Sequence, residues 1–317
     1  MTWAAQPERG SLWLSHLAVL LARRGGWTVG RILTIPATAW FLVTSRRARA
    51  ASREYLGRVL GRPVGWREVT GHFDHFACAV LDRVMLLCGH EAGYDIETEG
   101  LEGLLDVVRE GRGCILLGAH LGSFEVLRTL SRESPVKVWA LMYRRNAGGL
   151  TRLLDQLAPG LRAQVLEIGD TASMIQAKEC VERGEIVGIL ADRSPPGHRN
   201  VPAPFLGGVA EFPSGPWVLA AALAAPVFLF HAVRTGRRRY RAVIEPFAER
   251  VLLRRETRAA DLRFYVGRYA AALERACRAH PLEWFNFFPF WESANAQPGP
   301  AQPAPAPPSR LAGQPPG

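Results

Sequence analysis

The fold is decided by one stretch, Leu116-Leu117-Gly118-Ala119-His120-Leu121-Gly122-Ser123-Phe124-Glu125. An apolar run of the kind found in strands buried on both faces stops here at small residues, and a helical pattern follows. His120 therefore belongs to the turn, and Glu125 to the first or second turn of the helix. The small side chains around the turn leave room for another molecule to approach the imidazole. The stretch predicts a strand-turn-helix unit with a histidine and a carboxylate at its turn.

The sequence beyond residue 100 repeats this alternation of short apolar runs and amphipathic stretches. Strands are predicted at residues 114–117, 136–141, 164–168, 186–190, 226–230 and 240–244. Helices are predicted at residues 122–130, 147–157 and 171–181, and a last helix within residues 253–279. This alternation favours an α/β fold with a mostly parallel central sheet flanked by helices.

The first sixty residues have a different pattern. Apolar runs at residues 12–22 and 32–44 are separated by arginines and glycines, and neither reaches the ~20 residues of a spanning helix. Aromatic residues that look like interfacial anchors are Trp3, Trp13, Trp27, Trp40 and Tyr55. Basic residues that form a collar after the second run are Arg46, Arg47, Arg49, Arg53 and Arg58. We expect a helical segment that lies in a membrane surface, the alternative being a pair of buried helices with a solvated arginine face.

Composition divides the chain into three parts and limits its partners. We expect a membrane-associated helical segment at residues 1–60, an α/β domain at 61–295 and a disordered tail rich in Pro and Ala at 296–317. The net charge of +10 favours an anionic partner such as an acidic membrane surface. Nucleic acid is not expected, because the basic clusters lack the aromatic-flanked motifs of RNA-binding modules. The five scattered cysteines have no metal-ligand spacing, which predicts a reducing compartment and no metal site.

His120 and Glu125 are the candidate catalytic residues. A carboxylate that bonds one ring nitrogen fixes the tautomer, so that the other nitrogen can accept a proton from an alcohol. The helix N-terminus also disfavours the imidazolium and keeps the histidine basic. A histidine and a glutamate five residues apart are weak evidence by themselves, so the rest of the chain has to supply the context.

Three further blocks supply that context. The first is Met142-Tyr143-Arg144-Arg145-Asn146, and the second is Gly188-Ile189-Leu190-Ala191-Asp192-Arg193-Ser194-Pro195. The third comprises residues 201–208 together with Phe212-Pro213-Ser214-Gly215-Pro216. In order and spacing, these blocks and the H-x4-E run resemble the lipid A biosynthesis late acyltransferases, the lauroyl and myristoyl transferases of the H-x4-D/E acyltransferase superfamily. The resemblance extends from about residue 12 to residue 291.

The resemblance implies an enzyme, an O-acyltransferase that moves a fatty acyl group to a hydroxyl of a membrane lipid or glycolipid. The donor would be a thioester of acyl carrier protein or coenzyme A, a co-substrate, so that no cofactor is expected. His120 would be the general base and Glu125 its orienting partner. The protein would lie on the cytoplasmic face of the inner membrane as a peripheral or monotopic protein. The alternatives are a thioesterase or lipid hydrolase that uses water, and a non-catalytic lipid-binding protein.

The candidate substrate-binding residues are Arg144, Arg145, Asn146, Asp192, Arg193, Ser214 and Gly215. Arginine offers phosphate a planar fork of donors, although each of these arginines can instead pair with an acidic neighbour at the surface. Asp192 follows a predicted strand, where it either orients Arg193 or shapes the acceptor pocket. Ser214 and Gly215 start a predicted helix whose amide groups can face an anion.

Residues 284–291, Trp-Phe-Asn-Phe-Phe-Pro-Phe-Trp, form an aromatic segment near the end of the chain. It is either a hydrophobic plug under the sheet or a contact for an acyl chain or membrane. His72 and His75 lie on a predicted helix among phenylalanines, which indicates packing or a polar face rather than metal ligation.

Overall fold

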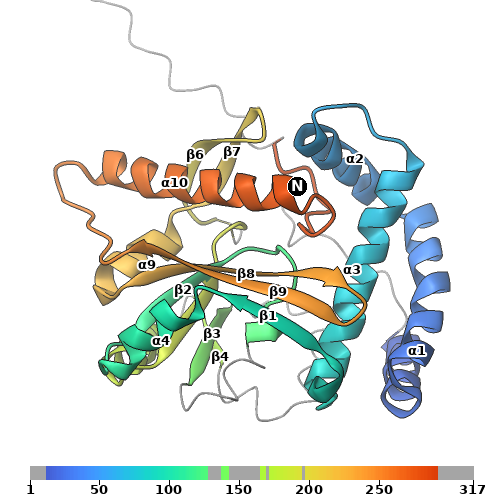
Figure 1. The fold of residues 1–317 in the computed structure, drawn as a ribbon. Helices are drawn as coiled ribbons and strands as arrows, with labels where there is room; N and C mark the ends of the chain where they lie inside the picture. The colour runs from blue at the N-terminus through green and yellow to red at the C-terminus, as the bar shows by residue number, and fades with distance from the viewer. Residues whose placement is uncertain (1–11, 128–136, 143–164, 169–170, 195–196, 292–317) are drawn as a thin grey trace, which may run out of the picture.

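The computed structural model of the chain describes residues 12–127, 137–142, 165–168, 171–194 and 197–291 (Figure 1). Within these ranges, seven strands form one sheet in the order β1-β9-β8-β2-β5-β3-β4, and β6 and β7 form a separate hairpin. The strands are β1 (Asp95–Glu99), β2 (Cys114–Gly118), β3 (Val138–Met142), β4 (Val165–Glu167), β5 (Ile186–Leu190), β6 (Asn200–Phe205), β7 (Gly208–Pro213), β8 (Val227–Gly236) and β9 (Arg239–Ala248). The helices are α1 (Leu12–Thr44), α2 (Arg46–Leu60), α3 (Trp66–Leu87), the short 3-10 helix η2 (Glu91–Gly93), α4 (Leu101–Arg109), α8 (Thr171–Glu182), α9 (Gly215–Leu223) and α10 (Arg258–Ala279).

The central sheet is mostly parallel, as the alternation of strands and helices predicts. Its neighbouring strands are parallel except β8 and β9, which are joined by a tight turn and pair antiparallel. All six predicted strands are present, and β8 and β9 extend six and four residues beyond their predicted ends at 230 and 244. The expectation of an α/β layered fold is therefore confirmed.

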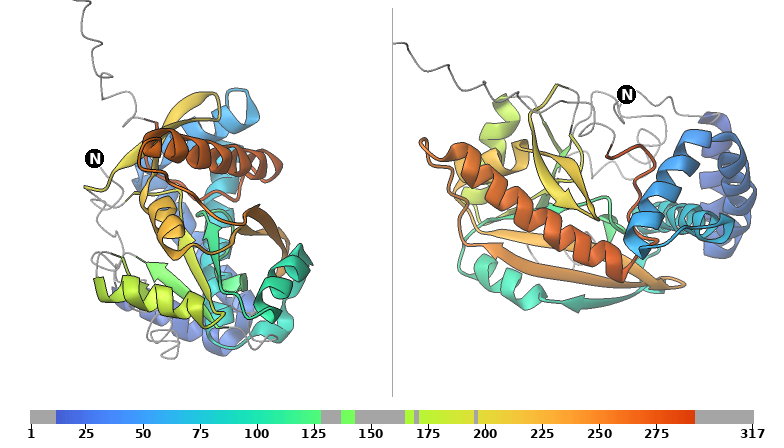
Figure 2. Two further views of the ribbon diagram at one scale, coloured as in Figure 1. Left: turned by 90° about the vertical axis from the view of Figure 1, so that its left-hand side faces the viewer. Right: turned by 90° about the horizontal axis from the view of Figure 1, so that it is seen from above.

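The apolar strands separate two layers of core. Alternate residues of β2 point to opposite faces, so Ile115 and Leu117 join one buried cluster while Cys114 and Leu116 join another. The first cluster includes one side of α10 and the second includes α4. Figures 1 and 2 show α10 across one face of the sheet and α4 on the other. A strand that is covered on both faces in this way has to be apolar throughout, as β2 is.

Helices α1 to α3 stack at one end of the sheet (Figure 2). Their packing centres on Asp82 of α3, which is fully buried and accepts hydrogen bonds from the indole of Trp27 and the hydroxyls of Tyr94 and Tyr240, each at 2.7 Å. These donors come from α1, from the segment before β1 and from β9. The buried carboxylate therefore ties the N-terminal helices to the sheet.

Helix α1 is two helices joined at a kink. Gly26 has φ 71° and ψ −171°, a conformation that glycine adopts at little cost and other residues rarely adopt. The kink explains the interruption between the two apolar runs of the sequence. Among the described helices, none is both long enough and apolar enough to cross a membrane.

Three strands, β1, β6 and β7, are not predicted from the sequence. In each case there is a physical reason why the pattern does not indicate a strand. β1 is an acidic, mostly exposed edge strand without an apolar run, and among the described strands it pairs only with β9. β6 alternates Pro202 and Pro204 with buried residues, and β7 completes its hairpin. Proline argues against a strand interior, but it is tolerated at an edge where its missing N–H faces solvent. The predicted helix at 147–157 and the tail at 296–317 lie outside the described residues.

Candidate functional site

His120 and Asp192 are brought together by the register of two neighbouring parallel strands. β2 pairs with β5 so that Gly118 lies opposite Leu190. His120 and Asp192 each follow these paired residues by two positions, at the carboxyl edge where open α/β sheets collect ligands. The amide of Ala191 also donates to the carbonyl of Gly118 at 2.9 Å, which continues the pairing beyond the strands. The sheet itself therefore places the two side chains side by side.

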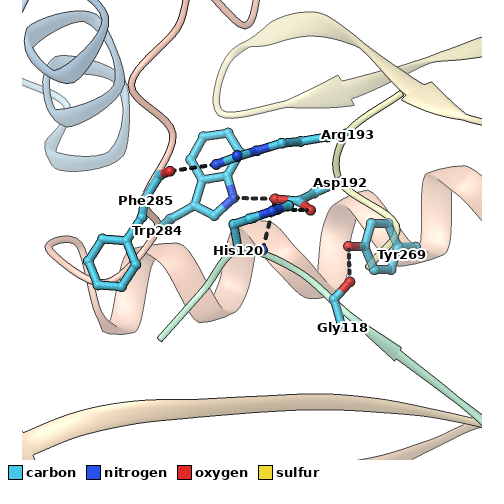
Figure 3. Close-up of polar contacts among 7 residues, drawn as sticks. All are labelled: Gly118, His120, Asp192, Arg193, Tyr269, Trp284 and Phe285. Atoms are coloured by element: carbon cyan, nitrogen blue, oxygen red, sulfur yellow. Dashed lines mark hydrogen bonds and ion pairs between the residues drawn. The ribbon is translucent and has the colours of Figure 1, made fainter. Parts of the chain in front are cut away.

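The two side chains form a close hydrogen-bonded pair (Figure 3). Nδ1 of His120 lies 2.8 Å from Oδ1 of Asp192, and the backbone amide of His120 donates to Oδ2 at 3.0 Å. The Asp192 side chain is fully buried, whereas one third of the His120 side chain, 33%, is exposed. Among the described residues, Nε2 of His120 has no hydrogen-bond partner. The pair thus holds Nδ1 of His120 against the buried carboxylate, while part of the imidazole side chain remains exposed.

The charges around the pair keep the aspartate ionised and the histidine neutral. Burial alone would raise the pKa of Asp192, but the charge and hydrogen bonds of His120 and the charge of Arg193 hold that pKa well below its usual range. The pKa of His120 is lowered, first by burial and then by the positive charges of Arg193 and Arg83, against the opposing effect of Asp192. An ionised Asp192 can only accept, so Nδ1 carries the proton and Nε2 is free to act as a base at neutral pH.

Asp192 has a third donor in the aromatic segment. The indole Nε1 of Trp284, a fully buried residue, donates to Oδ2 of Asp192 at 3.0 Å (Figure 3). The carboxylate therefore accepts three hydrogen bonds, two from His120 and one from Trp284. A buried carboxylate with this number of donors is strongly held in one orientation.

Glu125 does not take the place predicted for it. The predicted pairing with the His120 ring is wrong, because Nδ1 is bonded to Asp192, while Glu125 Oε1 lies 2.9 Å from Nε of Arg83 on α3. The turn explains the difference: the amides of Gly122 and Ser123 donate to the carbonyls of Glu283 and Ala232, both at 2.8 Å. This pairing delays the helix until Glu125 and carries that residue toward α3.

Gly122 is required by this turn. Its φ is 69°, and a Cβ at this position would lie 1.8 Å from the carbonyl oxygen of Ala232. Only glycine fits both the left-handed conformation and the close approach of the β8 backbone. The small residue that the sequence analysis took as room for a ligand is thus needed for the backbone itself.

Arg193 lies beside the pair and is half buried. Its Nη2 donates to the carbonyl of Phe285 at 2.6 Å, and its guanidinium carbon lies 5.4 Å from the ring centre of Phe288. Its Nε is buried without a hydrogen-bond partner in the described part of the chain. The side chain is therefore held by the aromatic segment rather than by a surface carboxylate. Its role in binding phosphate stays a prediction.

The remaining predicted binding residues lie elsewhere or are not described. Ser214 is the N-cap residue of α9, but its hydroxyl donates to the carbonyl of Arg199 at 2.9 Å and caps no amide. Gly215 is the first residue of α9. Within the described ranges, no hydrogen bond joins either residue to His120, Asp192 or Arg193. Arg144, Arg145 and Asn146 lie outside the described residues.

The other histidines of interest are structural, as predicted for His72. The His72 side chain is buried, its Nε2 lies 2.9 Å from the carbonyl oxygen of Trp284, and its Nδ1 lies 2.9 Å from Oγ of Ser52. Burial lowers its pKa to about 4. His75 contacts the Glu283 carboxylate at 2.6 Å. In the part of the chain that the structure describes, no group of three or more candidate ligands could hold a metal ion.

Arg83 and Trp284 are the two site residues that the sequence analysis missed. Arg83 lies on a helix far upstream of His120, and no motif marks it. Trp284 was noticed only as part of an aromatic segment, whose packing character the structure bears out: Trp284, Phe285, Phe290 and Trp291 are buried. A tryptophan with a buried ring needs a partner for its N–H, and that requirement is the signal that could have pointed to a nearby acceptor.

Comparison with known proteins agrees with the motifs. The family model described as bacterial lipid A biosynthesis acyltransferase matches residues 31–293 of the 317 residues. The matched range contains His120, Asp192, Arg193 and Trp284, together with every strand of the central sheet. Among individually curated proteins, none matches the chain. The resemblance drawn from four sequence blocks is therefore confirmed over most of the chain.

Proposed function

Because the chain belongs to the bacterial lipid A biosynthesis acyltransferase family, we propose that it is an O-acyltransferase in which His120 is the general base. The acyl donor is a thioester of acyl carrier protein or coenzyme A, and the acceptor is a hydroxyl of a membrane glycolipid or other membrane lipid. The observation that carries the proposal is the hydrogen bond of 2.8 Å between Nδ1 of His120 and the buried carboxylate of Asp192. With the proton on Nδ1, Nε2 is the ring nitrogen that can accept a proton from an incoming hydroxyl, and the His120 side chain is partly exposed.

The proposed reaction needs one proton transfer in each direction. Nε2 of His120 accepts the hydroxyl proton while the acceptor oxygen forms a bond to the thioester carbonyl carbon. The carbon–sulfur bond of the tetrahedral intermediate then breaks, and the departing sulfur takes the proton from Nε2. The ester and the free thiol are the products. No covalent acyl-enzyme is needed, because the thioester is already activated.

Asp192 and Arg193 have distinct tasks in this mechanism. Asp192 keeps the proton on Nδ1 and stabilises the imidazolium while His120 holds the hydroxyl proton. Arg193 carries a guanidinium beside the pair, where it can bind a phosphate of either substrate, the lipid head group or the phosphopantetheine arm. This role of Asp192 is proposed in place of the two expected from the sequence, which were to orient Arg193 or to shape the acceptor pocket.

The test compares lipids by mass spectrometry from cells that express the wild-type protein or His120→Ala. The proposal predicts a lipid that is heavier by one acyl group and depends on His120, and the mass difference identifies the chain. Free fatty acid without an acylated lipid would instead indicate a thioesterase or lipid hydrolase. Binding of lipid without any His120-dependent product would indicate a non-catalytic protein.

Glu125 is proposed to position Arg83, whose charge acts on His120, for binding of substrate. We expect Glu125→Gln to raise KM roughly tenfold and to change kcat little, since losing one ion-pair partner of Arg83 costs about 1.4 kcal/mol of substrate binding. Steady-state kinetics with the acyl donor and acceptor measure both constants. The matched control is Glu102→Gln, an exposed partner of Arg109 on α4. A loss of kcat as large as that of an Asp192 variant would show instead that Glu125 acts on His120.

The second half of α1 is proposed to lie in the membrane surface. Its exposed apolar residues, at positions spaced along one face of the helix, are Ile32, Ile35, Trp40 and Val43. Trp27, Arg31 and Phe41 hold the opposite face to α3, through Asp82, Asp74 and Phe73. An exposed apolar face beside an arginine-rich helix fits an anionic lipid surface.

Two of the aromatic residues expected from the sequence to be anchors, Tyr55 and Trp27, make contacts within the protein and are left out of the proposed contact. Tyr55 is fully buried and packs on Trp284, with ring centres 4.9 Å apart. Trp27 bonds to Asp82 and lies under the guanidinium of Arg237, 4.5 Å from the ring centre. Trp40 is exposed and remains an anchor in the proposal, as do the exposed collar residues Arg46, Arg47 and Arg53. Arg58 of the collar instead pairs with Glu54 and lies over the ring of Trp291. The collar fits the cytoplasmic face, where basic residues predominate.

Combined replacement of Trp40 and Val43 by serine is expected to weaken membrane binding about 100-fold, because burying two such side chains contributes about 3 kcal/mol. Sedimentation with vesicles that contain phosphatidylglycerol measures the partition constant. Phe264→Ser on α10 is the control, since Phe264 is also exposed but lies away from α1. Unchanged partitioning of the double variant would rule out this face as the contact.

A further inference from the structure

Trp284 contacts Asp192 of the catalytic pair, and aromatic rings pack around its indole. Its indole N–H points to Oδ2 of Asp192 (Figure 3), and its ring packs against Tyr55, Phe205 and Phe290, with centres 4.9, 5.3 and 5.0 Å away. The edge-to-face geometry of these contacts prevents the indole from turning. The donor is therefore aimed at the carboxylate before any substrate binds.

The backbone around Trp284 is attached to the His120 turn and to α3. The amide of Phe285 donates to the carbonyl of His120 at 2.8 Å, and Leu121 and Trp284 form an isolated β-bridge. On the other side, the Trp284 carbonyl accepts from Nε2 of His72, whose Nδ1 faces the hydroxyl of Ser52. The aromatic segment is thus bonded both to the His120 turn and to α3.

We propose that Trp284 is a positioning residue, which orients the Asp192 carboxylate so that Asp192 can orient His120. The inference depends on the proposed role of His120 as general base. The Trp284 N–H shares Oδ2 with the backbone amide of His120, and Oδ1 is left to the imidazole. The donor has two effects: it fixes the plane of the carboxylate, and it withdraws part of the negative charge that would otherwise stabilise the imidazolium.

Loss of this donor has a defined consequence for the imidazole. With one hydrogen bond fewer, the carboxylate carries more of its charge toward Nδ1 and favours the charged imidazolium, so the pKa of His120 rises. The carboxylate also gains rotational freedom, and Nε2 then spends less time in line with the reacting hydroxyl. A role in packing alone would lower stability without moving this pKa.

The other charges that face His120 stay in place when Trp284 is changed. They are Asp192 and Arg193 after β5, and Arg83 on α3, which is paired with Glu125. Arg193 is bonded to the carbonyl of Phe285, a backbone atom, so replacing the indole does not remove its anchor. A change in the titration of His120 can therefore be traced to the lost indole donor.

The experiment compares Trp284→Phe with Trp291→Phe in the full-length protein. Trp291 is a matched control, because it is buried in the same aromatic cluster and its indole donates at 3.2 Å to the carbonyl of Phe205 rather than to Asp192. We expect Trp284→Phe to lower kcat by up to about 10²-fold with little change in KM, and to move the acidic limb of the pH profile upward. Trp291→Phe should do neither.

A second measurement does not depend on substrate. The pKa of the His120 imidazole is followed by nuclear magnetic resonance of protein with isotope-labelled histidine, with the resonance assigned by its absence in His120→Gln. We expect the pKa to rise in Trp284→Phe and to stay at its wild-type value in Trp291→Phe. If Trp284→Phe does not fold, replacement of Trp284 by benzothienylalanine removes the N–H and keeps the ring shape.

The outcomes separate this inference from the proposed function. Equal losses of kcat in both tryptophan variants, with the His120 pKa unchanged, would show that Trp284 only packs. Full acyl transfer by His120→Ala would overturn the general base itself, and Trp284 would then have no catalytic pair to position. A raised His120 pKa with a selective loss of kcat in the Trp284 variants supports the inference.

Discussion

His120→Ala is expected to lower kcat for acyl transfer by about 10²- to 10⁴-fold, the usual contribution of a positioned general base. Without the imidazole, the acceptor hydroxyl has to lose its proton to water, while substrate binding by the rest of the site is retained. KM should therefore change much less than kcat. The measurement is the rate of ester formation from an acyl thioester and the acceptor lipid that mass spectrometry identifies.

The pH profile gives an independent check on the same residue. Because burial and neighbouring arginines lower the pKa of His120, the base is unprotonated at neutral pH, and kcat/KM should fall only as the pH drops below the ordinary histidine value of about 6.5. This acidic limb should disappear in His120→Ala. His90→Ala, at an exposed histidine before β1, is the control and should behave as wild type. Near wild-type transfer by His120→Ala would refute the assignment.

Asp192→Asn is expected to lower kcat about as strongly as His120→Ala. The loss should be about 10⁴-fold, because the substitution reverses the histidine tautomer, as in other acid-histidine pairs. The reason lies in the three donors around the carboxylate. Oδ2 faces two N–H groups, from the His120 backbone and the Trp284 indole, and neither can become an acceptor. The oxygen of asparagine has to take that position. Its NH2 then faces Nδ1, which must accept, and the proton moves to Nε2.

Histidine tautomers can be distinguished by nitrogen chemical shifts, which makes this prediction measurable without substrate. In the wild type the proton should be on Nδ1, and in Asp192→Asn on Nε2. Asp106→Asn, at an exposed partner of Arg109, is the control for a change of charge alone. An Asp192→Asn variant that keeps both the wild-type tautomer and its activity would contradict the mechanism.

The strands and their approximate bounds followed from the sequence because a doubly covered strand is apolar at every position. β2 and β5 were each placed from such runs, and His120 and Asp192 were each placed at a strand end. What the sequence does not contain is the order of strands in the sheet. Only the neighbouring positions of β2 and β5 bring Asp192 to His120 across 72 residues of chain.

The H-x4-E spacing predicts Glu125 as the partner of His120 if the helix starts at Gly122. In the structure the turn first pairs with β8, and the helix starts at Glu125. The hydrogen bonds from Gly122 and Ser123 to Glu283 and Ala232 join distant parts of the chain, so no local sequence pattern predicts them. The hydrogen bond from Trp284 to Asp192 cannot be predicted from a local pattern either, because the two residues are 92 positions apart.

The buried carboxylate of Asp82 has a consequence for how far the reaction centre stands from a bilayer. Its three donors join α1 to β9, and β9 belongs to the same sheet as β2, which is followed two residues after its end by His120. If α1 rests on the lipid surface, this rigid connection sets one depth at which Nε2 can meet a hydroxyl. Acceptors would then be sorted by how far their hydroxyl projects above the lipid surface, as well as by its chemical surroundings.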